Sequence, residues 1–177
     1  MIRRINQSFG KLYGQPCWNV RNGHGSFLTL EFGEPRLEIR EPHISDSESR
    51  NVREWACRRS VNVVGKWHLW IYSCDWKVVV DGKAKADSST VRKMERAPRI
   101  LDGQILKELG TKDRGKSWDF TFDLGATLHT TPYDRRSEQW TLYEPGNKVL
   151  SVRADKKYSY GSGDRTPKKE RWLSIDA

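Results

Sequence analysis

Short segments in which hydrophobic and polar residues alternate recur along the chain, and most of them end near Gly, Pro, Asn or Asp. Ser26–Phe32 is the first such segment, and Arg36–Arg40 repeats the pattern after Gly33-Glu34-Pro35. A period of two places the hydrophobic side chains on one face of a strand. Because Gly and Pro favour a turn, the two segments together predict a β-hairpin.

The strongest strand signal lies in Ser60–Tyr72, which is rich in Val and aromatic residues. Gly65, in its middle, indicates a bulge or a bend. After this glycine, alternation places Trp67, Leu69 and Ile71 on one face of the strand. We therefore expect this face to contact the second sheet of a two-layer fold.

The opposite face of the same strand carries His68, Trp70 and Tyr72. One hypothesis is that a helix near residues 89–97 covers them, which would make this a central strand buried on both sides. The functional hypothesis is that the three side chains line an open groove for a flat or apolar ligand or a partner.

The rest of the chain predicts three more strand pairs and a last strand. These are Trp76–Val80 with the segment after Asp81-Gly82, Gln104–Leu109 with Trp118–Leu124, Gln139–Tyr143 with Val149–Arg153, and finally Arg171–Ile175. One helix is predicted over Val91–Ala97, capped by Ser88–Thr90 and stopped at Pro98. Ser45–Cys57 is ambiguous between a short helix and a loop.

These elements predict one all-β domain over residues 1–177, an antiparallel two-sheet sandwich or flattened barrel of about 8–10 strands with one short helix. Gly65-Lys66-Trp67 resembles the Gly-x-Trp of the first strand in lipocalin-like barrels, although it lies far from the chain start. A closed lipocalin-like barrel is therefore the alternative. The predicted core is Trp18, Leu28, Leu30, Phe32, Trp67, Leu69, Ile71, Trp118, Phe120, Phe122, Leu124, Trp140 and Leu142.

Two segments of the chain resemble each other. Leu28–Gly33 and Phe120–Gly125 match in pattern at an offset of 92 residues. Any amphipathic strand that ends in a Gly turn has this pattern, which is the simpler explanation. The alternative is a duplication with halves at residues 10–90 and 100–177.

Composition changes this picture only in part. The chain of 177 residues has 31% charged residues, a net charge of +9 and a mean hydropathy of −0.82, which are values typical of partly disordered basic proteins. Aromatic residues nevertheless make up 11%, including 8 Trp. Each large ring buries roughly 150–250 Å², so the composition favours a folded domain with an aromatic core.

The basic residues are spread along the chain, with two local concentrations. The first holds Arg50, Arg53, Arg58 and Arg59, and the second holds Arg153, Lys156, Lys157, Tyr158, Tyr160, Arg165, Lys168, Lys169 and Arg171. Cations interleaved with tyrosines suit single-stranded nucleic acid, because charge follows the phosphates and rings stack on bases. A solvated surface or an acidic protein partner explains the same pattern.

Sequence motifs for chemistry are absent. His24, His43, His68 and His129 stand at no zinc-site spacing, no Gly-x-Ser-x-Gly occurs, and Gly161–Arg165 has no following Gly-Lys-Ser/Thr. We therefore expect no metal, no cofactor and no catalytic residues, and we lean against an enzyme.

The cysteines and the first residues bear on location. Cys17, Cys57 and Cys74 are odd in number and widely spaced, which favours free thiols in a reducing compartment. The first residues lack the apolar core of a secretory signal, and no segment has the length of a membrane span. We expect a cytoplasmic protein with no membrane contact.

By elimination, the sequence predicts a non-enzymatic cytoplasmic binding protein that acts through a protein–protein surface. The first alternative is a nucleic-acid-binding accessory protein that uses the basic and aromatic C-terminal stretch. The second is a small-ligand-binding β-barrel or an unrecognised hydrolase.

Overall fold

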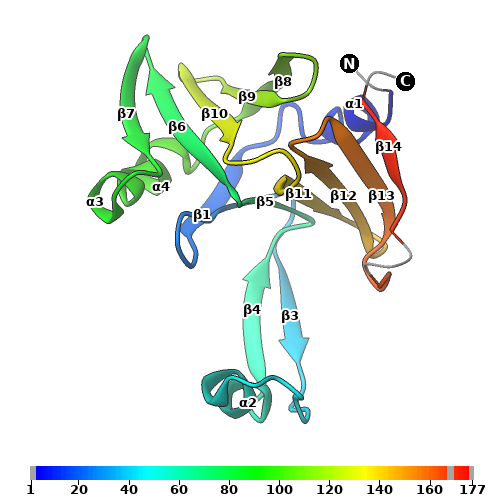
Figure 1. Cartoon of the computed structure of the whole chain (residues 1–177). Coiled ribbons are helices and arrows are strands. Elements are labelled where there is room, and N and C mark those ends of the chain that lie inside the picture. The colour runs from blue at the N-terminus through cyan, green and yellow to red at the C-terminus, as the bar shows by residue number, and fades with distance from the viewer. Residues whose placement is uncertain (1–2, 167–169, 176–177) are drawn as a thin grey trace.

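Two antiparallel sheets pack face to face in the computed structural model, which describes residues 3–166 and 170–175 (Figure 1). The larger sheet contains β1 (Cys17–Asn22), β2 (Leu28–Phe32), β5 (Trp67–Ile71), β11 (Glu138–Glu144), β12 (Lys148–Arg153), β13 (Lys157–Ser162) and β14 (Trp172–Ser174), in that spatial order. The smaller sheet contains β6 (Cys74–Val80), β7 (Lys83–Asp87), β8 (Leu106–Lys112), β9 (Ser117–Phe122) and β10 (Ala126–Pro132). Its spatial order is β7-β6-β10-β9-β8.

The predicted antiparallel sandwich is confirmed, and the sheets are not closed into a barrel, so the lipocalin-like alternative was wrong. The described residues form 14 strands, more than the predicted number. One reason is that Ser60–Tyr72 divides into two strands, and the other is that β1, β10 and β13 were not predicted. The two similar segments lie in opposite sheets, in β2 and β9, and duplication stays a prediction.

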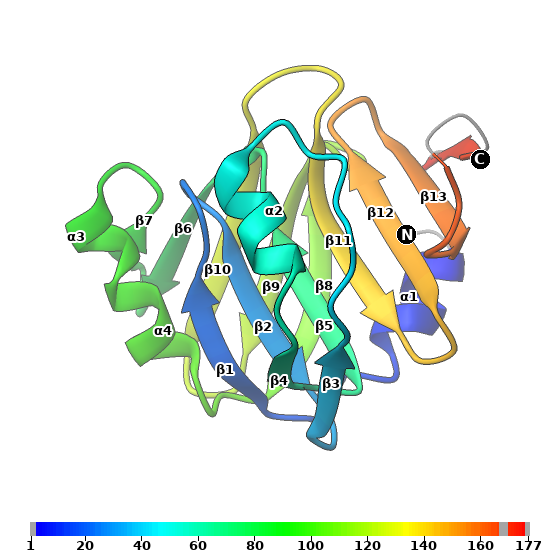
Figure 2. The same ribbon diagram turned by 90° about the horizontal axis from the view of Figure 1, so that it is seen from below.

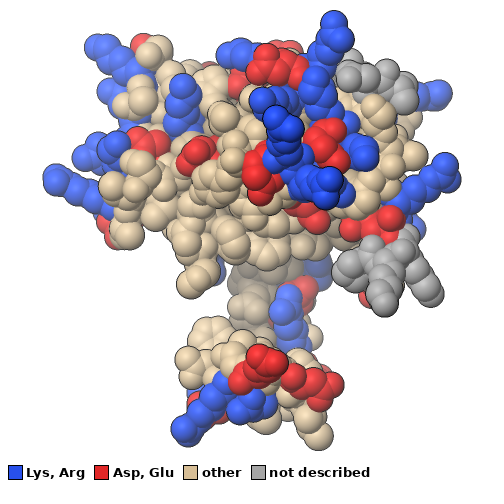
Figure 3. Space-filling view, viewed as in Figure 1, with Lys and Arg blue, Asp and Glu red and all other residues tan. Residues whose placement is uncertain are grey.

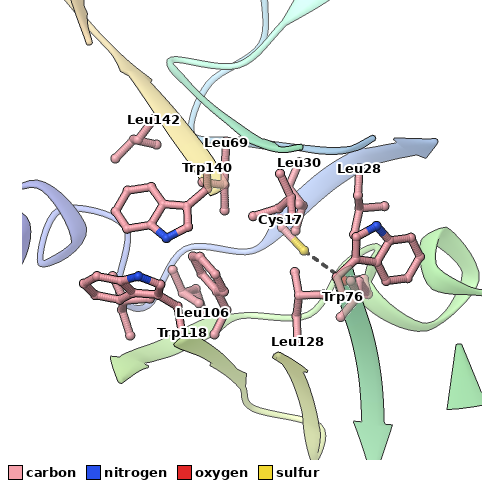
Figure 4. Close-up of a cluster of buried hydrophobic side chains, with 14 of the residues drawn as sticks. Cys17, Leu28, Leu30, Leu69, Trp76, Leu106, Trp118, Leu128, Trp140 and Leu142 are labelled. Carbon is pink, nitrogen blue, oxygen red and sulfur yellow. Dashed lines mark hydrogen bonds between the residues drawn. The ribbon is translucent and has the colours of Figure 1, made fainter. Parts of the chain in front are cut away.

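Side chains from both sheets meet in an aromatic and aliphatic core (Figure 4). The rings of Trp118 and Trp140 lie edge to face, with centroids 5.2 Å apart. All predicted core residues are buried except Trp18, which is half-buried, and Leu124. Leu124 is 71% exposed because it lies in the turn between β9 and β10, where strand alternation no longer applies.

The predicted hairpin of Ser26–Phe32 with Arg36–Arg40 was wrong. β2 pairs with β1 and β5, whereas β3 (Arg36–Arg40) pairs with β4 (Ser60–Val64) in a separate two-stranded ribbon. The chain leaves the large sheet at Gly33, whose φ is +76° and where a Cβ would lie 2.9 Å from the Trp67 ring. The sequence correctly predicted a turn at Gly33, but this turn directs the chain away from β2 instead of pairing the next strand with it.

Gly65 divides the predicted strand Ser60–Tyr72 into β4 and β5. A Cβ at Gly65 would lie 2.6 Å from the backbone oxygen of Phe32, so only glycine fits this junction. Residues 36–64 thereby form a projecting unit, which we call the arm. Figures 1 and 2 show the arm projecting from the outer face of the large sheet, with α2 (Arg50–Ala56) near its tip.

The predicted helix begins where expected, as α3 (Val91–Met94), with Thr90 at its N-cap. A second helix, α4 (Arg96–Leu101), follows, and Pro98 lies in its first turn, where a backbone N–H has no intrahelical partner. These helices contact β1 and β7 and do not cover the outer face of β5, so that part of the prediction was wrong. An unpredicted helix, α1 (Arg3–Phe9), packs Phe9 5.4 Å from the Trp140 ring.

Candidate functional site

A groove lies on the outer face of the large sheet, at the base of the arm. Its volume is about 820 Å³, within the range of about 300–1,000 Å³ typical of ligand sites. Side chains of β2, β5 and β11 form its floor, because strand alternation sends every second residue away from the core. The polar face of the arm, with Arg36, Glu38 and Arg40, forms one wall.

The structure brings two of the three predicted groove residues into the groove and places the third beside it. His68 and Trp70 line the groove, together with Tyr143 from the neighbouring strand β11. The ring centroids of His68 and Tyr143 lie 5.7 Å apart, and those of Trp70 and Tyr143 lie 6.4 Å apart. Tyr72 stacks 4.9 Å from Trp70 but is not part of the lining.

Tyr72 is anchored by its hydroxyl, which donates a hydrogen bond to a carboxylate oxygen of Glu138 and lies 3.2 Å from the Thr141 hydroxyl. Burial and this carboxylate raise the pKa of Tyr72 above its ordinary value. Burial likewise raises the pKa of Tyr143. Tyrosine is uncharged at neutral pH at its ordinary pKa, and these upward shifts keep both rings neutral to a higher pH.

A buried carboxylate supports the floor of the groove. Glu31 is 4% exposed, and its Oε1 lies 2.7 Å from Nδ1 of His68. Its Oε2 accepts a hydrogen bond of 2.8 Å from the backbone N–H of Gly65. Sequence reasoning did not select Glu31, although alternation in Leu28–Phe32 already placed it on the outer face. The missing information was the pairing of β2 with β5, which sets Glu31 opposite His68.

The arm exposes a second surface. Its register pairs Leu37 with Val63 and Ile39 with Val61, so these four side chains share one face of the ribbon. All four are about half exposed or more, with Leu37 at 64%. We call this surface the apolar face of the arm. The polar residues of β3 point to the opposite face, which borders the groove.

The predicted basic residues do not form one patch. In the first set, Arg50 and Arg59 form ion pairs within the arm, Arg53 donates to the backbone oxygens of Ser47 and Glu48, and Arg58 is exposed near them. Figure 3 shows basic and acidic atoms interspersed over the arm and this face of the body.

The two tyrosine rings of the C-terminal set are partly buried. Tyr158 and Tyr160 pack against the core, and the Arg4 guanidinium lies 3.6 Å from the centre of the Tyr160 ring. Arg153 pairs with Asp155 and covers the Trp172 ring. The remaining described members, at or near strand ends and the following loop, are Lys156, Lys157, Arg165 and Arg171, while Lys168 and Lys169 lie outside the described residues.

Within residues 3–166 and 170–175, no three His, Cys, Asp or Glu side chains gather closely enough to hold a metal ion. In the same part of the chain, no helix combines the length and apolar character needed to cross a membrane. The three cysteines are free thiols, with Cys17 and Cys74 buried and Cys57 exposed.

Comparisons with protein-family models, with curated proteins and with solved structures found no match for this chain.

Proposed function

We propose that this chain is a non-enzymatic binding protein and that a partner protein docks on the apolar face of the arm. The observation that carries this proposal is a concentration of exposed hydrophobic side chains. Of the twelve large hydrophobic side chains exposed among the described residues, seven lie in the arm. They are Leu37, Ile39, Ile44, Val52, Trp55, Val61 and Val63. Exposed apolar side chains concentrated in one unit of a protein are characteristic of an interaction site.

The second argument is the small size of the ribbon formed by β3 and β4. β3 and β4 form a sheet of two strands, so each has an outer edge that pairs with no strand in the part of the chain that the structure describes. A two-stranded ribbon is marginally stable in water unless a third strand or another surface covers it. A partner that covers Leu37 and Val63 would stabilise the ribbon and remove apolar area from water.

The tip of the arm contains a pocket that could hold a side chain of the partner. A hollow of about 470 Å³ lies between α2 and the start of β4, lined in part by Val52, Trp55 and Arg58. Trp and Arg are enriched among the residues that dominate protein–protein affinity.

The charges of the arm favour a partner that is apolar and close to neutral. Residues 36–64 hold six Arg and five acidic residues, so the arm contributes little to the net charge of +9. Arg40 lies 3.1 Å from Glu38, and Arg59 lies 2.8 Å from Glu41. Because cations and acids are almost equal in number on the arm, its net charge gives little preference for an acidic partner.

The test compares the wild-type chain with the double variant L37D/V63D, which places charges on the apolar face. Leu124→Asp is the matched control, because Leu124 is equally hydrophobic and 71% exposed on the body. Tagged proteins capture partners from the native host, and the protein captured by wild type is then purified and titrated calorimetrically. We expect the arm variant to weaken binding at least about 10-fold, equivalent to about 1.4 kcal/mol, while the control binds as wild type does.

Unchanged affinity of the arm variant would overturn the proposal, as would an equal loss in the control. Urea unfolding of each variant verifies that the body remains folded. Light scattering of the purified chain tests whether a second copy of the chain occupies this face. A dimer that the L37D/V63D variant dissociates would assign the apolar face to a second copy and contradict a separate partner.

A further inference from the structure

We propose that the groove at the base of the arm binds single-stranded nucleic acid, with bases stacked on Trp70 and Tyr143 and phosphates held by cations at the rim. The contacts proposed here come from the outer face of the large sheet and from the polar face of the arm. Val63 of the apolar face also lines the groove, but the proposal does not require a partner bound to that face.

The floor of the groove is a stacking platform. Tyr143 stands opposite His68 in the register of β11 and β5, and the Trp70 and Tyr143 rings are inclined by only 33°. Phe27 packs edge to face against Trp70, with centroids 5.5 Å apart, and holds that ring in place. Aromatic rings on an open sheet face bind unpaired bases by stacking, and the binding tolerates many base sequences.

The rim of the groove carries cations without carboxylate partners. Arg21, Arg36, Lys66 and Lys148 line the groove from four different segments, and none forms an ion pair with the residues that the structure describes. A phosphate chain that crosses the rings can therefore meet cations at several points around them.

The acidic side chains that line the groove already interact with donors or cations of the chain itself. Glu31 accepts from His68 and Gly65, and Glu38 pairs with Arg40. Glu144 is buried, accepts a hydrogen bond from Ser8 and lies 3.6 Å from Arg4. The cations at the rim are thus left with a net attraction for an anion.

Rings and cations together select the ligand. Cations alone would accept any polyanion, but the ring platform adds affinity only for a ligand with exposed planar groups. In a duplex the bases stack on one another and their faces are closed to side chains, so single strands fit and duplexes do not.

The experiment is fluorescence anisotropy with 5′-fluorescein-labelled decamers of one sequence, as single-stranded RNA, single-stranded DNA and duplex DNA, at several salt concentrations. Unlabelled single strand and inorganic polyphosphate serve as competitors. The variants are Tyr143→Ala and Arg36→Ala. Their matched controls are Tyr133→Ala, which removes another exposed ring, and Lys107→Ala, which removes an exposed cation from the opposite sheet. The two single-stranded decamers distinguish RNA from DNA as the source of the ligand.

We expect Tyr143→Ala to weaken binding roughly 10-fold with no change in salt dependence, because one base loses its stacking surface. Arg36→Ala should weaken binding and reduce the slope of log K against log salt by about 0.7, the value for one phosphate contact of a single strand. Both controls should bind as wild type does, and unfolding curves establish that all four variants are folded.

Three results would overturn the proposal. The first is absence of wild-type binding at low salt. The second is an equal loss of affinity in the controls, which would indicate non-specific attraction to a basic protein. The third is a duplex that binds as tightly as the single strand, or inorganic polyphosphate that competes as well as unlabelled single strand does. Neither of these ligands offers open base faces.

Discussion

Glu31 and His68 face each other across β2 and β5, with Oε1 of the carboxylate 2.7 Å from Nδ1 of the imidazole. The second carboxylate oxygen accepts a hydrogen bond from the backbone N–H of Gly65, where the chain returns from the arm to the large sheet. One buried side chain thus connects the floor of the groove to the root of the arm.

Replacement of this carboxylate should destabilise the fold. Glu31→Ala leaves the Gly65 N–H without an acceptor, and we expect a loss of about 1–3 kcal/mol in the free energy of unfolding. Glu31→Gln keeps an acceptor oxygen and should lose less. Urea unfolding measures both. Glu38→Ala is the control, because that residue forms an ion pair on the arm and should change stability by less than about 1 kcal/mol. Equal losses at the two positions would contradict this role of Glu31.

A methyl group at Gly65 should be much more costly than one at Gly110. The Gly65 Cβ would lie 2.6 Å from the Phe32 backbone oxygen, whereas the nearest atoms to a Gly110 Cβ lie 3.9 Å away on Asp119. We expect Gly65→Ala to destabilise the chain by several kcal/mol, on the order of 3 kcal/mol, as for other severe steric changes. Gly110→Ala should stay within about 1 kcal/mol of wild type. Thermal unfolding compares them, and similar midpoints would show that the junction is not as tight as described.

Trp140 and Trp55 offer a contrast between core and arm. Trp140 is fully buried and contacts the rings of Phe9, Trp118 and Phe120, while Trp55 is 79% exposed. Trp140→Ala should cost about 3–5 kcal/mol because it opens a cavity, and Trp55→Ala should change stability by about 0.5 kcal/mol or less. Chemical denaturation gives both values. A large loss for Trp55→Ala in the isolated chain would mean that the arm tip is packed more tightly than its exposure indicates.

Only one of the three thiols should react quickly in the folded chain. Burial raises the pKa of both Cys17 and Cys74 to about 12, so at pH 8 they are protonated as well as shielded from solvent. Cys57 is exposed. A chromogenic disulfide reagent at pH 8 should therefore label one thiol per native chain and three after denaturation. Cys57→Ser should abolish the rapid phase, and rapid labelling of that variant would contradict the burial of the other two.

Most of the strands could be predicted from the chain alone, because alternation and turn residues are local properties. Asp81-Gly82 illustrates this: both residues have positive φ, and they join β6 to β7 as the turn chemistry requires. The buried face of β5 was also predicted correctly, with Leu69 and Ile71 fully buried. The failure at Leu124 marks the limit of this reasoning, since a pattern cannot show where a strand stops and its turn begins.

Only some of the residues that line the groove could be predicted from the sequence. His68 and Trp70 were selected because they share the outer face of one strand, but Tyr143 and Glu31 come from strands far away in the chain. The register that places Leu69 between Leu30 and Leu142 also brings these four polar and aromatic residues together on the other face. Sequence distance conceals such a site, because its members become neighbours only when the sheet forms.

Leu30 and Leu37 show most clearly where local pattern ends. Both stand in short alternating strands on either side of the same turn, yet Leu30 is fully buried and Leu37 is 64% exposed. Periodicity and turn residues determined that each segment is a strand with an apolar face. Whether that face meets the second sheet or solvent was decided by tertiary structure, because burial depends on which distant strands pack together and on the junction at Gly65 that carries the arm away from them.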